Sequence, residues 1–332
     1  MADVARQAGV SHQTVSRVLN GHPNVSPATR ASVLAAIRAL GYRPNAAART
    51  LVTGRTNVLG VISFDTTLYG SAAKLYGIER AARPAYSVAI TSLAGFDRNS
   101  LTEAVERFLG QAVDGIIVIA PETAAVEAVT DLAPGIPLVA VASGIRAPLP
   151  SVAIDNLSGA AKATQHLLDL GHQTVHHIAG PDSWLDAQER AEGWRQALRA
   201  AGAPEPGLLH GDWSARSGYE IGHQLAAMPE VTAVLCGNDQ MALGLLRALA
   251  EHGRHVPGDV SVVGFDDFPE AAFFQPPLTT VRQDFAELGR RGLHLLLDRI
   301  SGEHGLQPAL PIEPELVVRA STGPAGGRRP PR

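Results

Sequence analysis

From Val58 onward, short apolar runs rich in β-branched residues alternate with amphipathic stretches long enough to form helices. Buried strands that alternate with helices pair in parallel and carry helices on both faces of the sheet. We therefore predict an α/β core with parallel sheets, whose ligand binds beyond the carboxyl ends of the strands. The predicted strands are VLGVIS, YSVAITSL, GIIVIA, PLVAVA, SVAID, TVHHIAG, AVLCGND and SVVGFDD.

Polar residues at the ends of these runs are the first candidates for a binding site. Asp239 is expected to cap the following helix rather than to touch a ligand. Asp266 and Asp267 resemble a catalytic carboxylate pair, but neighbouring strand residues point to opposite sides and make a poor acid/base couple. The same alternation argues against joint metal binding by His176 and His177. The strand-end candidates are Asp155, Asn156, Gly180, Asn238, Asp239, Asp266 and Asp267.

The N-terminal segment has the spacing of a helix-turn-helix. The first helix stops at Gly9, and Ser11 can cap a second helix whose Val15 and Val18 face inward. If this second helix enters a major groove, its outward side chains can hydrogen-bond base edges or phosphates. These side chains belong to His12, Gln13, Thr14, Ser16 and Arg17.

A third predicted helix completes a small all-α head over residues 1–44. Ser26 can cap this helix, Pro27 suits its first position, and Gly41 stops it. Any short helical bundle could show this spacing, so the spacing alone leaves DNA binding open. The apolar residues of the third helix are Val33, Leu34, Ile37 and Leu40.

Charge is distributed unevenly along the chain. Residues 1–55 contain seven arginines and one acidic residue, a net charge of +6, so the remainder carries −10 to give the overall −4. A basic head attached to an acidic body is typical of a nucleic-acid-binding module joined to another domain. A solvated basic surface would give the same charge count.

Composition narrows the function classes. No run of about eighteen apolar residues exists, and MADVARQAGV lacks the apolar stretch of an export signal, so we expect a cytoplasmic protein without a membrane partner. The single cysteine, Cys236, is expected to be a small core residue. We expect no enzyme and no cofactor, because phosphate-loop, GxSxG and metal-ligand motifs are lacking. A transport-type solute-binding protein is a competing interpretation, but it would need an export signal.

The head sequence DVARQAGVSHQTVSRVLNG, followed by VSPATRASVLAAIRALGYRPN, resembles the headpiece of the lactose-repressor family of bacterial transcription regulators. The resemblance implies that His12, Gln13 and Arg17 read bases of double-stranded DNA. Only Met1 and Ala2 precede the motif, whereas family members usually carry several residues there, so we expect an upstream start or a first helix that frays. Residues implied to position the helix on the DNA backbone are Ser11, Thr14, Ser16 and Asn20.

Residues 45–56 are predicted to join the head to the core. NAAARTLV favours a helix, but so short a helix is marginal in water without support. The family resemblance implies a hinge helix that forms on specific DNA, with Asn45 and Ala48 at the DNA and Leu51 wedged between base pairs of the minor groove. A plain interdomain linker is the alternative.

The rest of the chain continues the family resemblance through GDWSARSGYE, GNDQMALGLLRAL, VSVVGFDD and PPLTTVRQDF. The resemblance implies a periplasmic-binding-protein-like core of two Rossmann-like lobes, crossed three times by the chain, with an effector in the cleft. The core would span 57–321, with the first lobe at 57–154 and 286–312 and the second at 155–285 and 313–321. Residues 322–332 are predicted to be a disordered tail.

Candidate effector-binding residues follow from the same resemblance. Arg190, Asn238 and Asp266 match positions that hold sugar hydroxyls, which suits planar groups with several donors or acceptors. Trp213 and Phe285 match aromatic positions that pack on the sugar ring. The remaining candidates are Gln283 and Asp186 at neighbouring positions and Trp184 as a second aromatic wall.

The first-lobe wall departs from the family pattern. Ala142 and Ile119 stand where a pocket aspartate and a pocket asparagine would be, and Lys74 replaces an apolar residue. A pocket that loses hydrogen-bonding groups rejects hydroxyls that it no longer satisfies, because an unpaired buried polar group costs about 1 to 3 kcal/mol. We expect a saccharide effector, of which a β-galactoside is one candidate, and a purine or another non-sugar effector is the alternative.

The family resemblance also predicts how such a protein assembles. A pseudo-palindromic operator requires a two-fold dimer, which we expect to form through the core. The C-terminal sequence STGPAGGRRPPR contains no leucine heptads, so we expect a homodimer rather than a coiled-coil tetramer. The expected function is that of a DNA-binding repressor whose operator affinity is controlled by the effector.

Overall fold

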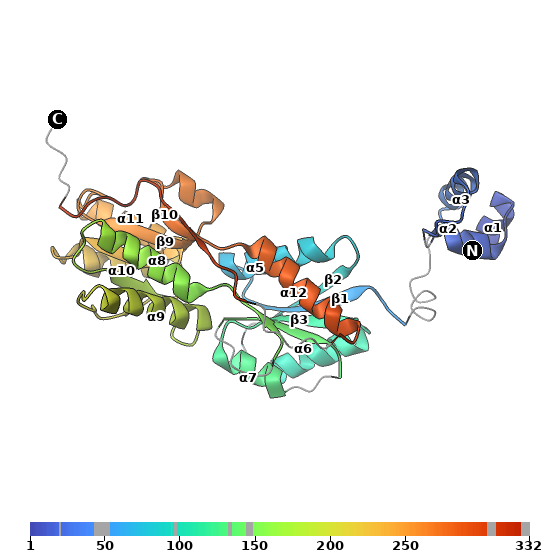
Figure 1. Ribbon diagram of the computed structural model, residues 1–332, viewed down its shortest axis with the longest axis horizontal. Helices are drawn as coiled ribbons and strands as arrows, with labels where there is room; N and C mark the ends of the chain where they lie inside the picture. Colours follow the sequence, from blue (N-terminus) through green and yellow to red (C-terminus); the bar gives the residue numbers. More distant parts are fainter. Residues whose placement is uncertain are drawn as a thin grey trace. The chain divides into compact units, whose positions relative to one another are not determined.

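The chain folds as two units, a head unit of residues 1–56 and a core unit of residues 57–332 (Figure 1). The computed structural model describes residues 1–19, 21–42, 54–93, 95, 98–131, 135–143, 149–303 and 310–326. The predicted DNA contacts at Asn20, Asn45, Ala48 and Leu51 lie outside these described residues.

The described part of the head unit contains three helices: α1 (Ala2–Ala8), α2 (His12–Leu19) and α3 (Pro27–Ala39). The predicted helix ends are confirmed. Gly9 ends α1 in the left-handed conformation (φ 68°), and the hydroxyls of Ser11 and Ser26 each accept a backbone N–H three residues later at 3.1 Å. The small core of the head consists of Val4, Ala5, Val15, Val18, Val33 and Ala36.

The apolar residues of α3 do not all face this core. Leu34 and Leu40 are 43% and 45% exposed, whereas the smaller Ala36 is buried. Val33 and Ala36 lie three residues apart on the face that packs against α1 and α2, and Leu34 and Leu40 lie off that face.

The first sheet of the core unit is entirely parallel. Its strands, in spatial order, are β2 (Ser87–Leu93), β1 (Val58–Phe64), β3 (Gly115–Ile119), β4 (Leu138–Val141) and β5 (Ser151–Val152). One face packs against α5 (Tyr69–Ala82) and α12 (Phe285–Ile300) through Ile78 and Leu296. The other face packs against α6 (Arg98–Gly110) and α7 (Thr123–Asp131) through Leu101 and Val129. We call this layered body the first lobe.

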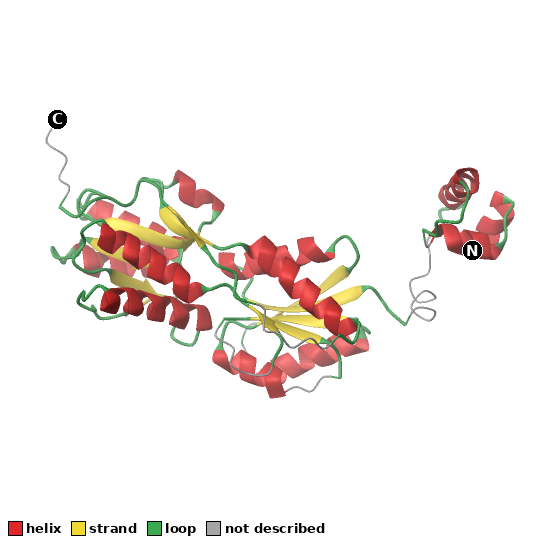
Figure 2. Cartoon of the chain, viewed as in Figure 1, coloured by secondary structure: helices red, strands yellow, loops and turns green. Residues whose placement is uncertain are grey.

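The second sheet has the order β11 (Glu315–Val317), β10 (Thr279–Arg282), β9 (Ser261–Asp266), β8 (Ala233–Cys236), β6 (His176–Ala179) and β7 (Leu209–His210). Only the β10–β11 pair is antiparallel. Helices α8 (Asn156–Asp169) and α9 (Leu185–Ala200) cover one face, and α10 (Ala215–Ala226) and α11 (Asp239–Glu251) cover the other. A short 3₁₀ helix, η1 (Pro269–Phe273), follows β9. This second lobe completes the predicted two-lobed α/β architecture (Figure 2).

The chain passes repeatedly between the lobes. The segment from β5 to α8 and the segment leading to β11 run side by side, because Ile154 and Ile312 form a parallel bridge and Asp155 N–H donates to the Ile312 carbonyl at 2.9 Å. Another crossing leads from β10 to α12. Phe285, the first residue of α12, is buried in the core of the first lobe.

The predicted disordered tail is wrong for residues 322–326, which pack on the second lobe. Thr322 lies 3.0 Å from His166 Nε2, Gly323 N–H donates to Ser261, and Ala325 N–H donates to the Leu170 carbonyl. Backbone and side-chain hydrogen bonds to a packed helix and strand hold this segment in spite of its Gly and Pro content. Within the described ranges, no helix is long and apolar enough to span a membrane.

Helices α5 and α12 pack unusually closely at two glycines. A Cβ atom added to Gly77 would lie 2.1 Å from the Phe285 carbonyl oxygen, and one added to Gly289 would lie 2.2 Å from Gly77. Such a contact is with backbone, so the helices themselves would have to separate. The absence of side chains at these two positions therefore sets the distance between α5 and α12. Helix α5 carries one wall of the cleft described below.

We predict that Gly77→Ala lowers the free energy of unfolding by about 1 to 3 kcal/mol, because the added methyl group overpacks this crossing. Thermal unfolding followed by circular dichroism would measure the change. Gly110→Ala is the control, since a Cβ at this position in α6 meets nothing within 4 Å and alanine is the better helix former. Equal melting temperatures for the two variants would contradict the packing argument.

Candidate functional site

A cleft lies between the two lobes. Residues at the start of α5 form its first-lobe wall, and strand-end and α9 residues form its second-lobe wall. Seven of the eight predicted effector residues line the cleft, whereas Phe285 does not. The lining residues are Leu68, Tyr69, Gly70, Ser71, Lys74, Trp184, Asp186, Arg190, Trp213, Asn238, Asp266 and Gln283.

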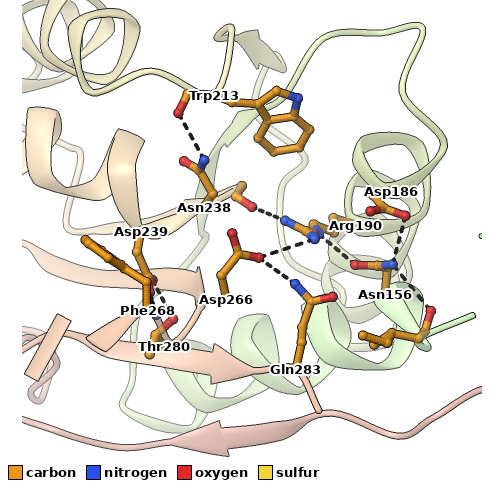
Figure 3. Close-up of polar contacts among 12 residues, drawn as sticks. Asn156, Asp186, Arg190, Trp213, Asn238, Asp239, Asp266, Phe268, Thr280 and Gln283 are labelled. Carbon is orange, nitrogen blue, oxygen red and sulfur yellow. Dashed lines mark hydrogen bonds and ion pairs between the residues drawn. The ribbon is translucent and has the colours of Figure 1, made fainter. Parts of the chain in front are cut away.

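Arg190 of α9 is the centre of the second-lobe wall (Figure 3). Its Nε donates to Asn156 Oδ1 at 2.8 Å, Nη1 donates to the Gly237 carbonyl, and Nη2 lies 3.6 Å from Asp266 Oδ1. The guanidinium carbon lies 3.9 Å from the centroid of the Phe265 ring. These contacts join α8 with the ends of β8 and β9, so two of the predicted strand-end residues, Asn156 and Asp266, meet at one buried cation.

Asp266, the last residue of β9, is held between Arg190 and Gln283. Gln283 Nε2 donates to Asp266 Oδ1 at 2.5 Å. Burial raises the pKa of Asp266 to about 6, although the charges of Arg190 and Lys74 act to lower it. Asp266 also has a φ of 107°, which is unfavourable for a residue with a side chain. Strained backbone and a perturbed carboxyl at one position are typical of functional sites.

Asn238, not Asp239, caps α11, so the expected cap at Asp239 is wrong. Asn238 Oδ1 accepts the Met241 N–H at 2.8 Å while its Nδ2 donates to the Trp213 carbonyl at 3.0 Å. An amide can accept and donate at once, whereas a carboxylate can only accept. Asp239 is instead the first helical residue, buried against Thr280 and the backbone N–H of Phe268. Burial, followed by the charge of Asp266, raises its pKa well above the usual value.

Two tryptophans provide the aromatic surface of the cleft. Trp184 and Trp213 meet edge to face, with ring centroids 5.6 Å apart. Trp213 has a φ of 72°, and its ring lies so close to Gly180 that a Cβ there would be 2.1 Å from it. Within the described structure, Trp213 Nε1 and Gln283 Oε1 are buried without a hydrogen-bond partner. Figure 3 shows the Gln283 oxygen turned away from Asp266.

Asp186 joins the two walls of the cleft. It accepts Lys74 Nζ of the first lobe at 2.7 Å and Ser143 Oγ at 2.7 Å, and it lies 3.3 Å from Asn156 Nδ2. Burial would raise the pKa of Asp186, but Lys74 and Arg190 lower it to about 2. The carboxylate is therefore ionised and is surrounded by donors from both lobes.

The first-lobe wall contains residues that the sequence patterns missed. Tyr69 follows β1 and contacts Phe268 and Phe285, and burial together with the charge of Asp266 raises its pKa to about 12. The sequence could have indicated this wall, because the segment from Leu68 to Lys74 follows the predicted strand VLGVIS. Ile119 lies in the hydrophobic core instead of the cleft.

The predicted DNA-reading residues lie on the outer face of α2. His12, Gln13 and Arg17 are exposed, whereas Thr14 and Ser16 are half-buried. Ser11 is exposed and lies 2.9 Å from the Thr14 hydroxyl, so it serves as the helix cap. The described part of the head therefore presents its long polar side chains on one helix face, opposite Val15 and Val18.

The structure gives no basis for a metal or nucleophilic centre in the described residues. No group of three or more His, Cys, Asp or Glu side chains there could hold a metal ion. His177 is fully enclosed, its Nδ1–H donates to the Leu235 carbonyl at 2.9 Å, and burial lowers its pKa to about 4. Cys236 is buried, and burial raises its thiol pKa.

The carboxyl group of Glu189, next to Arg190 on α9, makes the stability of the protein depend on pH. Burial, followed by the charges of Asp186 and Asp155, raises its pKa from 4.5 to about 7. Between these two pH values the folded protein keeps a proton that the unfolded chain loses, so stability falls as pH rises. Glu189→Gln removes this loss.

We predict that the stability of Glu189→Gln relative to the parent increases by on the order of 1 to 2 kcal/mol as the pH is raised from 5 to 8. This is less than the full value of about 1.36 kcal/mol per pKa unit, because Glu189 is only partly buried. Urea unfolding followed by fluorescence reports on this region, because all three tryptophans (184, 194 and 213) lie in the second lobe. Glu192→Gln, at a half-buried position on the same helix where the side chain is 41% exposed, is the control. A pH-independent difference for Glu189→Gln would contradict the assignment.

Comparison with known proteins agrees with this geometry. Residues 1–45 match the family "Bacterial regulatory proteins, lacI family", and residues 164–322 match "Periplasmic binding protein-like domain". The HTH-type transcriptional regulator CelR of Thermobifida fusca is 38% identical over 96% of both chains. A structure of the lac repressor dimer bound to operator and the anti-inducer ONPF superposes with a TM-score of 0.85 at 34% identity, covering 97% of this chain and 98% of that one. A CelR–cellobiose complex superposes with a TM-score of 0.73 at 34% identity, over 96% and 98%. The chain belongs to the lacI family of bacterial regulatory proteins.

Proposed function

We propose that the protein is a transcription repressor whose operator affinity is controlled by a small saccharide bound in the cleft between the lobes. The observation that supports this most directly is the convergence of planar polar groups beside two tryptophans. Arg190, Asn238, Asp266 and Gln283 all line the cleft with Trp184 and Trp213.

This set of groups suits a saccharide. Sugar hydroxyls both donate and accept, so adjacent hydroxyls can be held by planar amide, carboxylate and guanidinium groups. Aromatic rings pack against the apolar C–H faces of a sugar. The second hydrogen of Asn238 Nδ2 and the unpartnered Gln283 oxygen supply a donor and an acceptor in addition to those already used within the protein. The relative CelR has been solved as a complex with cellobiose, which favours the same ligand class here.

The head supplies the DNA-binding surface in this proposal. Residues 1–55 carry a net charge of +6, and the exposed face of α2 presents His12, Gln13 and Arg17. A positive charge attracts the phosphate backbone, and side chains of these types recognise base edges in the major groove. The related lac repressor has been solved as a dimer on its operator, so we infer a homodimer acting on DNA in the cytoplasm. Residues 45–56 would then form the hinge.

Effector and DNA binding must be reciprocal if they are coupled. When a saccharide weakens operator binding by some factor, the operator weakens saccharide binding by the same factor, with typical coupling of about 1 to 3 kcal/mol. The coupling requires that the effector prefer one arrangement of the two lobes over another. The proposed protein is thus a regulator without catalytic activity.

We predict that the full-length protein binds DNA from the upstream region of its own gene and that one saccharide releases it. Fluorescence anisotropy would measure this at two salt concentrations, with a panel of mono- and disaccharides and with purine bases and nucleosides. Affinity is expected to fall steeply with salt, as counterions are released from DNA. Release by a purine and by no saccharide would overturn the saccharide assignment, whereas no preference for any DNA would overturn the repressor assignment.

We predict that Gln13→Ala weakens specific operator binding by about 1 to 3 kcal/mol and leaves the salt dependence unchanged, because an uncharged side chain that reads a base makes no counterion contribution. Gln7→Ala is a matched control, since Gln7 is also an exposed glutamine but lies on α1. Equal losses in the two variants would mean that α2 is not the reading helix.

A further inference from the structure

Lys74 is chemically unusual within this chain. The sequence contains only two lysines, Lys74 and Lys162. The Lys162 side chain is 40% exposed and pairs with Glu313 at the surface, whereas Lys74 is only 9% exposed and lines the cleft. A buried ammonium group is costly unless its charge and its hydrogen-bonding capacity are satisfied.

The pairing of Lys74 is incomplete. Its Nζ carries three hydrogens and donates to Asp186 Oδ2 at 2.7 Å, its sole hydrogen bond to any residue that the structure describes. Asp186, by contrast, has three donors around it, from Lys74, Ser143 and Asn156. The carboxylate thus has three partners, whereas the ammonium group has one and retains two donors in the wall of the cleft.

Lys74 also occupies the part of the wall where the family pattern has lost polar groups. A second, smaller pocket adjoins the cleft and shares Lys74, Asp186 and Gln283 with it. Apolar residues, among them Ala142, form much of its lining. Lys74 of α5 therefore supplies a charged hydrogen-bond donor to this part of the first-lobe wall, where the Ala142 side chain at the end of β4 supplies none.

The charges in the cleft are balanced. The cations Lys74 and Arg190 face the acidic residues Asp186 and Asp266. Arg190 already uses three of its five N–H groups on Asn156, the Gly237 carbonyl and Asp266, and its charge is paired with Asp266. An anionic ligand would give these paired groups an excess negative charge, whereas a neutral ligand would leave the charges balanced.

We propose that Lys74 is a ligand-contacting, specificity-determining residue that donates its two remaining ammonium hydrogens to oxygen atoms of an uncharged saccharide. Asp186, reaching from the opposite lobe, fixes the position of the ammonium group. This assignment rests on the proposed function, because it takes the ligand to be a saccharide. It adds to that function a contact from the first lobe and the expectation that the saccharide is uncharged.

Isothermal titration calorimetry on the full-length protein tests the proposal. The ligands are neutral mono- and disaccharides, with the 6-phosphate and uronate derivatives of whichever sugar binds. The proteins are the parent, Lys74→Met, the double variant Lys74→Met/Asp186→Ser, and Lys162→Met as the matched control. Circular dichroism and DNA binding establish that each variant is folded.

The expected result is a loss of saccharide affinity on the order of 10- to 100-fold in Lys74→Met, the range for a lost hydrogen bond to a charged group. The double variant separates contact from charge compensation, because it removes the unpaired Asp186 carboxylate as well. The double variant is expected to bind the saccharide as weakly as Lys74→Met, and Lys162→Met is expected to bind it like the parent. The anionic derivatives are expected to bind more weakly than the neutral sugar.

Spectroscopy adds a direct readout. With ε-¹⁵N-lysine the chain gives two ammonium signals, and saccharide is expected to shift that of Lys74 alone. Parent-like affinity in the double variant would overturn the contact, since Lys74 would then only neutralise Asp186. Anionic derivatives that bind as tightly as the neutral sugar would overturn the charge class. A parent protein that binds none of the saccharides would instead overturn the proposed function itself.

Discussion

The cleft is organised around a guanidinium group that has been removed from water. Arg190 is only 4% exposed, and arginine remains protonated at any ordinary pH. Its donors must therefore be satisfied by the protein, and three separate segments supply the acceptors: Asn156, the Gly237 carbonyl and Asp266. Removing one partner of a buried ion pair typically costs about 3 to 5 kcal/mol. The need to satisfy Arg190 therefore fixes how the start of α8 and the ends of β8 and β9 lie relative to α9.

The same site contains features that oppose folding. Asp266 and Trp213 both have positive φ values, and conformations of this kind cost about 1 to 3 kcal/mol each. Burial also works against ionisation of Asp266 in spite of its two cationic neighbours. These costs are local, whereas the packed sheet and helices around them are well satisfied. Such a distribution is expected where side chains are held ready for a ligand instead of for stability.

Sequence patterns predicted the fold well where burial follows local periodicity. All eight predicted runs contain strands, from β1 to β6 and then β8 and β9. The patterns missed β7, β10 and β11, which are two to four residues long. In β10 the buried residues include polar Thr280, whose hydroxyl donates to Asp239, 41 positions away. No local pattern can reveal that a threonine will be buried by so distant a partner.

The candidate site was also predictable in part, because the positions of the strand ends follow from the local sequence pattern. Residues that follow strands could be located from the α/β rule, and family resemblance selected among them. The role of Lys74 could not be located in this way, because it depends on Asp186, 112 positions away and in the other lobe. Phe285 matched an aromatic pocket position, but in the structure it is the first residue of α12 and its side chain packs in the first-lobe core.

The N-terminal end of α9 gives the cleft a direct connection to the arrangement of the lobes. Leu185 N–H donates to the Pro121 carbonyl at 2.8 Å, Trp184 forms a bridge with Glu122, and Asp186 accepts from Lys74. Three consecutive residues thus contact the first lobe, and two of them, Trp184 and Asp186, also line the cleft. A ligand that displaces either side chain changes a contact between the lobes. A ligand shifts a conformational equilibrium only through differential contacts with the two states, so we expect these positions to link occupancy of the cleft to lobe geometry.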